Sequence, residues 1–493
     1  MSVTRPNVVV FIPDQLRADC VGAFGNPVVQ TPNLDALAAR GARFDNAYVQ
    51  HPVCSPSRAS FLTGWYPHVV GHRTLTHLLQ PDEPNFLKTF KNNGYQVIWA
   101  GARGDTFAAG GTEASVDAYG FTDPPPAPLG HATFPDDLSA RLFYSGRIDD
   151  PDRVDFDEAA VRTAEEWLAT GPDGPWLLFL PILAPHCPFQ VAEPWFSMYD
   201  RSAVPDPVPP AGDDDGREPD FHQAIRDSYG LDRATPQTWR EVVATYYGMI
   251  SRMDDHLGRV MAAVQQAGAA DTTITAFFAD HGEYLGDYGL IEKWPSAMSG
   301  NITRDPLILA GPGIPPGTVV QDMVEIIDVF PTLLDLANVP DDTHRHYGRT
   351  LTPTLTHGAA HREYAFTEGG FTLEEEPQLE RPAFPYDLKG ELQHRDPRLV
   401  GKAAAVRDQR YTYVERLYEG PELYDRISDP AERLNRAGQP QVAAVQHRLR
   451  EALIRWLQET ADVIPATEDP RFPTVDLPEP SHPASIADMK VPG

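Results

Sequence analysis

Apolar runs typical of buried strands alternate with amphipathic runs typical of helices, and this alternation constrains the fold more than any other feature of the sequence. Strand-like runs cover residues 7–13, 95–100, 176–183, 272–279 and 305–310. Helix-like runs cover residues 31–41, 86–92, 157–169, 235–266 and 328–337. Because strands that alternate with helices form parallel sheets covered on both faces, we predict an α/β fold with a large, mostly parallel central sheet flanked by helices.

Two of the strand-like runs end in a carboxylate. Asp14-Gln15 follows the first run, and Asp280-His281 follows the run at residues 272–279. Functional sites form beyond the carboxyl ends of strands in such sheets, so we expect these side chains to converge. Two carboxylates, a carbonyl oxygen and an imidazole nitrogen make a mostly hard donor set for a divalent cation. Asp14 could also be a simple turn former after Pro13, but the second segment favours the metal site.

A third segment, residues 54–64, reads CSPSRASFLTG. Pro56 suits the first position of a helix, because its missing N–H would have no partner there. Arg58 would then lie one helical turn from Cys54 on the same face. A buried cysteine is by itself only a small hydrophobic residue, so the other two segments decide in favour of a site.

These three segments together resemble the signature of type I, formylglycine-dependent sulfatases in the alkaline phosphatase superfamily. The closest motifs are those of choline-sulfatase-like and phosphonate-monoester-hydrolase-like members. In this family a formylglycine-generating enzyme oxidises the cysteine to an aldehyde, and the hydrate of that aldehyde is the nucleophile. One hydrate oxygen attacks sulfur, and the other is deprotonated so that the carbonyl re-forms and expels sulfate. The resemblance implies formylglycine at Cys54 and an alkaline-phosphatase-like fold.

The resemblance also implies one divalent cation. Its ligands would be Asp14, Gln15, Cys54, Asp280 and His281. Most sulfatases carry Asp-Asp where this chain has Asp14-Gln15, although the relatives named above also carry Asp-Gln. Glutamine removes one negative charge and leaves the cation more electropositive. Calcium is therefore the first expectation and manganese the alternative.

Other residues match family positions that contact the ester. Lys293 ends the run that begins at Asp280, and His186 lies in a Pro-His-x-Pro-Phe motif after the strand at residues 176–183. The resemblance implies that Arg58 stabilises the nucleophile and that Lys293 and His186 hold the transferring group. His186 or Lys293 would protonate the departing alcohol. Cys54, Arg58, His186 and Lys293 are thus the expected catalytic residues.

Three further residues are expected to bind substrate: Arg103, His72 and Arg73. The family's Gly-Lys-x-His element is replaced here by residues 101–105, GARGD, and a slip of one residue would put Arg103 in the place of the lysine. The planar guanidinium of arginine can donate two hydrogen bonds at once to a tetrahedral anion. His72 and Arg73 match a His-Arg-Thr/Ser element of related Asp-Gln enzymes. A structural role for His72 is an equal alternative.

The composition favours a small anionic ester as substrate. A formal charge of −29 repels nucleic acid and acidic polymers at long range, so a local pocket must attract the anion. Three cysteines give no disulfide framework. The N-terminal residues lack the pattern of a signal peptide, and no run approaches the ~20 apolar residues of a membrane span. We expect a cytoplasmic protein without nucleic-acid or membrane partners, and homo-oligomerisation is left open.

The character of the sequence changes near residue 385. We expect a catalytic domain over residues 1–385 and a smaller α+β subdomain over residues 386–493. A hairpin at residues 402–414, the ELYD sequence at 422–425 and a helix at 442–460 resemble the C-terminal module of sulfatases. A proline-rich tail follows from residue 465.

The first functional hypothesis is metal-dependent hydrolysis of a small sulfate ester by S–O cleavage. The alternative is a phosphonate monoester or phosphodiester hydrolase with the same nucleophile, which Gln15 and the altered element at residues 101–105 motivate. A third hypothesis is a non-catalytic binding protein in which Cys54 is never oxidised. The presence of metal ligands and anion-binding residues together argues against this last hypothesis.

Overall fold

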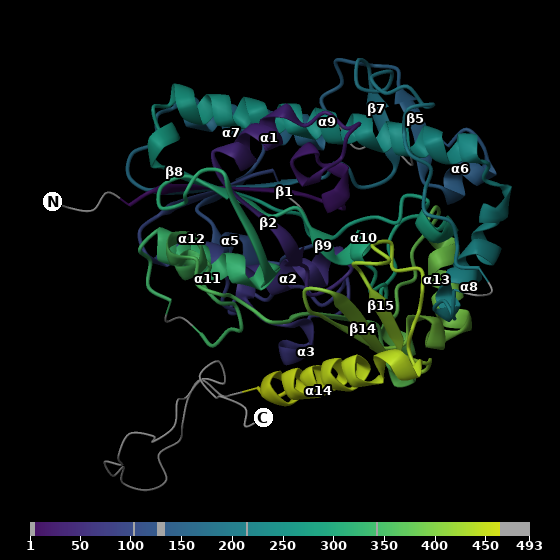
Figure 1. Cartoon of the computed structure of the whole chain (residues 1–493). Coiled ribbons are helices and arrows are strands. Elements are labelled where there is room, and N and C mark those ends of the chain that lie inside the picture. The colour runs from purple at the N-terminus through teal and green to yellow at the C-terminus, as the bar shows by residue number, and fades with distance from the viewer. Residues whose placement is uncertain (1–4, 102–103, 126–133, 213–214, 342–343, 464–493) are drawn as a thin grey trace, which may run out of the picture. The chain divides into compact units, whose positions relative to one another are not determined.

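The computed structural model describes residues 5–101, 104–125, 134–212, 215–341 and 344–463. One compact unit runs to Asp462. It holds a nine-stranded sheet, a four-stranded sheet and a two-stranded sheet (Figure 1). The two-stranded sheet pairs β5 (Tyr144–Ile148) with β7 (Phe189–Ala192). No helix in the described part of the chain is long and apolar enough to cross a membrane.

The nine-stranded sheet is mostly parallel, as predicted. Its strand order is β11-β2-β10-β8-β1-β6-β3-β4, and β9 pairs with β2. Strand β10 runs antiparallel to both of its neighbours, β8 and β2, and β9 is antiparallel to β2, whereas the other pairs are parallel. The strands are β1 (Asn7–Pro13), β2 (Gly41–Tyr48), β3 (Gln96–Ala100), β4 (Ala118–Gly120), β6 (Trp176–Ile182), β8 (Thr273–Phe277), β9 (Arg304–Asp305), β10 (Ile308–Ala310) and β11 (Thr318–Glu325).

Helices cover both faces of this sheet. Strand β1 is buried along its whole length, and its alternating side chains enter two different cores, as the two-residue period of a strand requires. Val9 and Phe11 pack into the core that contains α7 and α9, while Val8, Val10 and Ile12 pack into the core that contains α2, α4 and α11. Figure 1 shows α1, α7 and α9 on one face, with α2, α11 and α12 on the other. These helices are α1 (Pro32–Ala39), α2 (Cys54–Thr63), α4 (Phe86–Asn92), α7 (Phe156–Ala169), α9 (Pro236–Gln266), α11 (Val329–Leu336) and α12 (Thr352–His357).

Local sequence signals explain most helix boundaries. Helix α9 begins behind a capping box at Thr235 with Pro236 in its first turn. The expectation that Pro56 opens a helix is wrong, because α2 begins two residues earlier, at Cys54. None of the N–H groups in the first turn has an intrahelical partner, so proline is tolerated at the third position as well. The helix therefore starts with the predicted nucleophile, and Gly64 ends it in a left-handed conformation (φ 72°).

A smaller antiparallel sheet follows near the C-terminus. Its strands are β12 (Ala365–Gly369), β13 (Ala403–Arg407), β14 (Tyr411–Arg416) and β15 (Glu422–Asp425). The predicted hairpin and helix are present, and Trp456 of α14 (Ala443–Thr460) packs against Phe366 of β12, with ring centroids 4.9 Å apart. Strand β12 precedes residue 385, and the domain boundary given there stays a prediction. The proline-rich tail lies outside the described residues.

The remaining α-helices of the described residues lie in the connections. They are α3 (Pro67–Val70), α5 (Gly111–Ser115), α6 (Asp137–Arg141), α8 (Asp220–Tyr229), α10 (Gly300–Thr303) and α13 (Asp387–Arg395). Residues 204–211, rich in proline, form no regular element. Helix α13 follows β12 in the chain and lies beside the loops that carry the candidate site, as its contacts below show.

Candidate metal centre and active site

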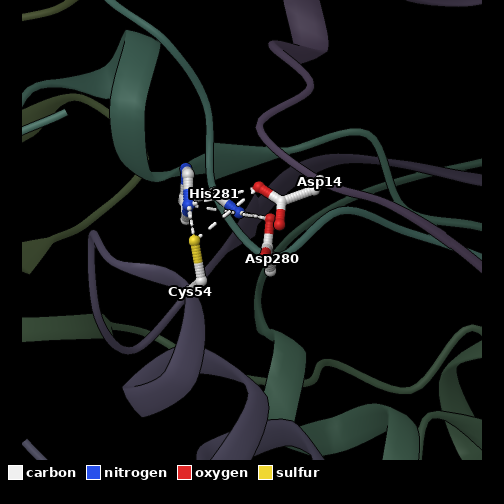
Figure 2. A group of neighbouring side chains, drawn as sticks. All are labelled: Asp14, Cys54, Asp280 and His281. Carbon is white, nitrogen blue, oxygen red and sulfur yellow. Dashed lines mark hydrogen bonds and ion pairs between the residues drawn. The ribbon is translucent and has the colours of Figure 1, made fainter. Parts of the chain in front are cut away.

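Four buried side chains from three distant segments converge at one point (Figure 2). The ligand atoms of Asp14, Cys54, Asp280 and His281 all lie within 4.8 Å of one another. Asp14 directly follows β1, Asp280 lies three residues beyond the end of β8, and Cys54 is the first residue of α2. The carboxyl ends of the parallel strands β1 and β8 thus meet the N-terminus of a helix, as the sequence predicts.

Backbone contacts hold these segments in place. The Asp14 amide donates to the carbonyl of Ile182 at 3.0 Å, which extends the β1–β6 ladder by one bond. The Ser57 hydroxyl of α2 donates to the carbonyl of Asp280 at 2.6 Å. The amide of Gln15 donates to Asp280 Oδ1 at 3.0 Å. The first connection ties Asp14 to β6, and the other two each link two of the three segments, so the cluster is fixed by backbone as well as side-chain contacts.

His281 directs the lone pair of its Nε2 into the cluster. Its Nδ1 lies 2.9 Å from the carbonyl of Gly282, which can only accept, so Nδ1 carries the proton and Nε2 is the basic atom. Nε2 lies 3.1 Å from Cys54 Sγ and 3.7 Å from Asp14 Oδ1. Burial lowers the pKa of His281, which favours the neutral ring. A neutral imidazole whose second nitrogen is held by a carbonyl is the usual arrangement of a metal-binding histidine.

Arg58 joins the two carboxylates. Its Nη2 lies 3.1 Å from Asp14 Oδ2 and 2.9 Å from Asp280 Oδ2, and all three side chains are buried. Its Nε lies 3.5 Å from Asp105 Oδ2. The Nη1 group is buried and has no hydrogen-bond partner among the described residues. One guanidinium thus faces three carboxylates and keeps a spare donor.

These donors fit a divalent cation. Two carboxylates, one imidazole nitrogen and the side chain at position 54 supply the hard and borderline ligands that calcium and manganese accept. The Nε2 lone pair of His281, which faces the cluster, and the excess of carboxylates over the single guanidinium both favour a cation here. Burial raises the pKa of the Cys54 thiol, and Asp14 raises it further, so the unoxidised side chain is a neutral thiol and a poor nucleophile.

A second group of polar side chains adjoins the cluster through Gln15, which has a left-handed backbone (φ 66°). Gln15 Oε1 accepts a hydrogen bond from Lys293 Nζ at 2.8 Å, and its Nε2 donates to Glu283 Oε2. Lys293 Nζ also lies 3.1 Å from His186 Nε2. Because His186 Nδ1 lies 2.5 Å from the carbonyl of Cys187, Nδ1 carries a proton and Nε2 accepts from the lysine.

Gln15 and Lys293 each contact a buried glutamate, and the two glutamates differ in charge state. Burial, with a further contribution from Glu292, raises the pKa of Glu283 to about 7. Burial also acts to raise the pKa of Glu292, but the neighbouring ammonium groups of Lys293 and Lys389 outweigh this effect and lower the pKa to about 2. Glu292 is therefore ionised at neutral pH, whereas Glu283 is partly protonated.

The predicted substrate-binding residues occupy different surroundings. Both ring nitrogens of His72 have partners, at 2.8 Å from the carbonyl of His77 and 3.0 Å from Glu83 Oε1. Arg73 donates to the carbonyl of Gly370 and pairs with Glu375. Within the described part of the chain, neither side chain hydrogen-bonds to the metal-site cluster, and their substrate roles stay predictions. Arg103 lies outside the described residues.

Sequence reasoning missed several residues of the site. Asp105, Glu283, Glu292 and Lys389 contact predicted catalytic residues directly or through one neighbour. Sequence reasoning also passed over His51, a buried histidine whose Nε2 has no hydrogen-bond partner among the described residues. Glu283 follows Asp280-His281-Gly282 in the chain, and this position could have identified it as a candidate site residue. Nothing in the sequence distinguishes Lys389 from other lysines on helices.

Comparison with known proteins defines the class. The model of the family described as Sulfatase matches residues 6–339, which is more than half of the chain, and the protein therefore belongs to the sulfatase family and is an enzyme. The predicted family membership and the alkaline-phosphatase-like fold are both confirmed.

The most informative relatives differ in their named activities. A sulfatase of Formosa agariphila is 27% identical, over 88% of this chain and 83% of that protein. The multifunctional alkaline phosphatase superfamily protein PehA of Trinickia caryophylli is 28% identical, over 93% and 96%. The solved phosphonate monoester hydrolase of Agrobacterium radiobacter is 26% identical, with a TM-score of 0.74 over 92% of this chain and 96% of that one.

Proposed function

We propose that this enzyme hydrolyses a small sulfate ester, using formylglycine derived from Cys54 and one divalent cation. The observation that carries the proposal is the convergence of Asp14, Cys54, Asp280 and His281 within 4.8 Å, beside Arg58 and Lys293. Family membership supports the reaction class. Calcium is the first candidate for the ion, with manganese as the alternative. Oxidation of Cys54 would require a formylglycine-generating enzyme in the host.

The residues around position 54 have separable roles. The cation would supply a Lewis acid for an ester oxygen and lower the pKa of a hydroxyl at position 54. Arg58 balances Asp14 and Asp280, and its Nη1 group has no hydrogen-bond partner among the described residues. Lys293 Nζ, held by Gln15 and His186, carries positive charge and a proton at the far side of the site. It can bind an anionic oxygen or protonate the departing alcohol.

The electrostatics of the chain support a small substrate. A formal charge of −29 opposes the approach of sulfated polymers at long range. The cations near the site, Arg58 and Lys293, are buried beside carboxylates that offset their charge at a distance. A small ester with one anionic group can be attracted by these two cations, and it carries no further negative charges that the acidic surface would repel.

Phosphonate monoester or phosphodiester hydrolysis is the second candidate. The similarity to the Agrobacterium radiobacter phosphonate monoester hydrolase favours it, as does Gln15 in place of the aspartate of most sulfatases. Such esters carry one negative charge near the reacting atom, as sulfate monoesters do, so the same cations could serve both. The two candidates differ in substrate preference and share the nucleophile.

Two measurements test the proposal. Peptide mapping by mass spectrometry of protein co-produced with a formylglycine-generating enzyme should find the aldehyde at position 54. That material should then hydrolyse an aryl sulfate with a higher kcat/KM than matched aryl phosphonate monoesters and aryl phosphodiesters. A higher kcat/KM for either phosphorus ester would replace the first candidate by the second. An unoxidised thiol in enzyme that still turns over would contradict both.

A further inference from the structure

Lys293 belongs to a buried chain of alternating charges that reaches into α13. Glu292 Oε1 lies 2.6 Å from Lys293 Nζ, and Glu292 Oε2 lies 2.7 Å from Lys389 Nζ. The three side chains are between 3% and 6% exposed. One carboxylate thus divides its two oxygens between a lysine of the site and a lysine of a helix almost a hundred residues further along the chain.

The two lysines exclude a second metal site at this position. His186, Cys187 and Glu292 have ligand atoms close enough to hold an ion. However, ammonium groups already lie against both oxygens of Glu292, and a cation there would meet two positive charges. Cys187 Sγ lies 3.1 Å from the hydroxyl of Tyr386, and burial raises the pKa of this thiol. The group is therefore a lysine–carboxylate cluster and no metal centre.

Helix α13 is fixed against the site at two points. Tyr386, which precedes its first residue, contacts Cys187, and Lys389 contacts Glu292. Glu292 itself has a left-handed backbone (φ 65°), which is uncommon for a residue other than glycine. Its amide donates to Glu283 Oε1 at 2.5 Å. Lys389 lies beyond the residues that match the family model, 6–339.

We propose that Lys389 is a positioning residue that neutralises Glu292 and so leaves the charge of Lys293 available to the anionic substrate. Glu292 alone would cancel Lys293, and the pair would present no net charge to an anion. With Lys389 present, the cluster of two lysines and one carboxylate has a net charge of +1. The inference rests on the proposed function in one respect, namely that Lys293 binds the anionic part of the ester.

Charge removal and charge restoration test this role. Inorganic sulfate is titrated by calorimetry into calcium-loaded wild type, Lys389→Met, Lys389→Arg and the double variant Lys389→Met/Glu292→Gln. Lys389→Met should weaken sulfate binding by about tenfold, as expected for the loss of one unit charge near a buried anion site. Lys389→Arg and the double variant should bind within a few-fold of wild type, because both restore a net charge of +1 around Lys293.

Arg395→Met is the matched control, because it removes a positive charge from an exposed position of the same helix. It should leave sulfate affinity unchanged. With the oxidised enzyme, Lys389→Met should raise KM for the ester more than it lowers kcat. If Lys389→Met does not fold, the double variant is compared with Glu292→Gln, and the double variant should bind sulfate about tenfold more weakly.

Unchanged sulfate affinity in Lys389→Met, no rescue in the double variant, an equal loss in Arg395→Met, or no sulfate binding by wild type would each overturn the inference. The proposed function is judged separately, on hydrolysis of the aryl sulfate. Enzyme that shows the predicted sulfate-binding pattern but hydrolyses only phosphorus esters would reject the sulfatase proposal and leave the role of Lys389 intact.

Discussion

Replacing Arg58 by methionine should reveal whether its guanidinium and a divalent cation balance the same carboxylates. In wild type, Nη2 lies 3.1 Å from Asp14 and 2.9 Å from Asp280, with all three side chains at most 1% exposed. Removing one partner from a buried ionic cluster costs about 3–5 kcal/mol, because the remaining charges stay buried. We expect a loss of this size in the free energy of unfolding of the metal-free protein.

Calcium should recover much of that loss. A ligand that binds only the folded state stabilises it by about 2.7 kcal/mol at a concentration of 100 Kd. Arg58→Met leaves the two carboxylates without their cation and should bind calcium more tightly than wild type. The assay is urea unfolding with chelator and with excess calcium, supported by melting temperatures under both conditions.

Arg362 provides the matched control for this experiment. Its guanidinium also joins two buried carboxylates, with Nη1 2.9 Å from Glu325 and Nε 2.8 Å from Asp328. These residues are not part of the candidate metal cluster. Arg362→Met should therefore be destabilised to a similar degree and gain no more from calcium than wild type gains. The reasoning fails if calcium stabilises both variants equally, or if metal-free Arg58→Met is as stable as wild type.

Three further predictions concern single side chains. Cys54→Ala should contain no aldehyde and hydrolyse no ester, yet keep its melting temperature within a few degrees; residual turnover in purified protein would contradict the assigned nucleophile. His281→Ala should lower metal affinity by at least about tenfold, measured by calorimetry with calcium and manganese; unchanged affinity would remove His281 from the ligand set. Burial lowers the pKa of His51 from 6.5 to about 3, so its contribution to stability is complete above about pH 6.5 and is lost as the pH falls toward 3. In urea unfolding below about pH 6, wild type should therefore lose up to about 1.4 kcal/mol per pH unit more than His51→Asn, and parallel pH profiles would show that His51 is not buried as a neutral ring.

Much of the fold follows from local signals in the sequence. Pro236 behind the Thr235 cap marks the start of α9, and the apolar run before Asp14 marks β1. The antiparallel insertion of β10 between β8 and β2 was not predicted, because strand direction depends on connections that local patterns do not encode. The start of α2 was misplaced by two residues, since proline fits more than one position in a first turn.

The candidate site also contains some residues that the sequence predicts and others that it does not. The convergence of Asp14 and Asp280 could be predicted from the sequence, because both follow parallel strands whose carboxyl ends lie at the same edge of the sheet. The buried partners of the site could not be predicted, because contacts such as those of Asp105 with Arg58 and of Lys389 with Glu292 depend on tertiary packing. The substrate-binding role of His72 stays a prediction. Its ring nitrogens contact the carbonyl of His77 and the carboxylate of Glu83, and its motif does not indicate these partners.

The buried charges around the site explain why binding of a divalent cation and binding of the substrate should depend on each other. Four buried carboxylates lie near three buried cationic side chains; these residues are Asp14, Asp280, Glu283, Glu292, Arg58, Lys293 and Lys389. Even with Glu283 partly protonated at its pKa of about 7, this set offers little net attraction to an anion. A divalent ion would change the balance to clearly positive within a dry region, where unit charges interact most strongly. Under the proposed function, the excess of acidic residues over the whole chain would keep polyanions away, and the metal-loaded site would then select small anionic esters at short range.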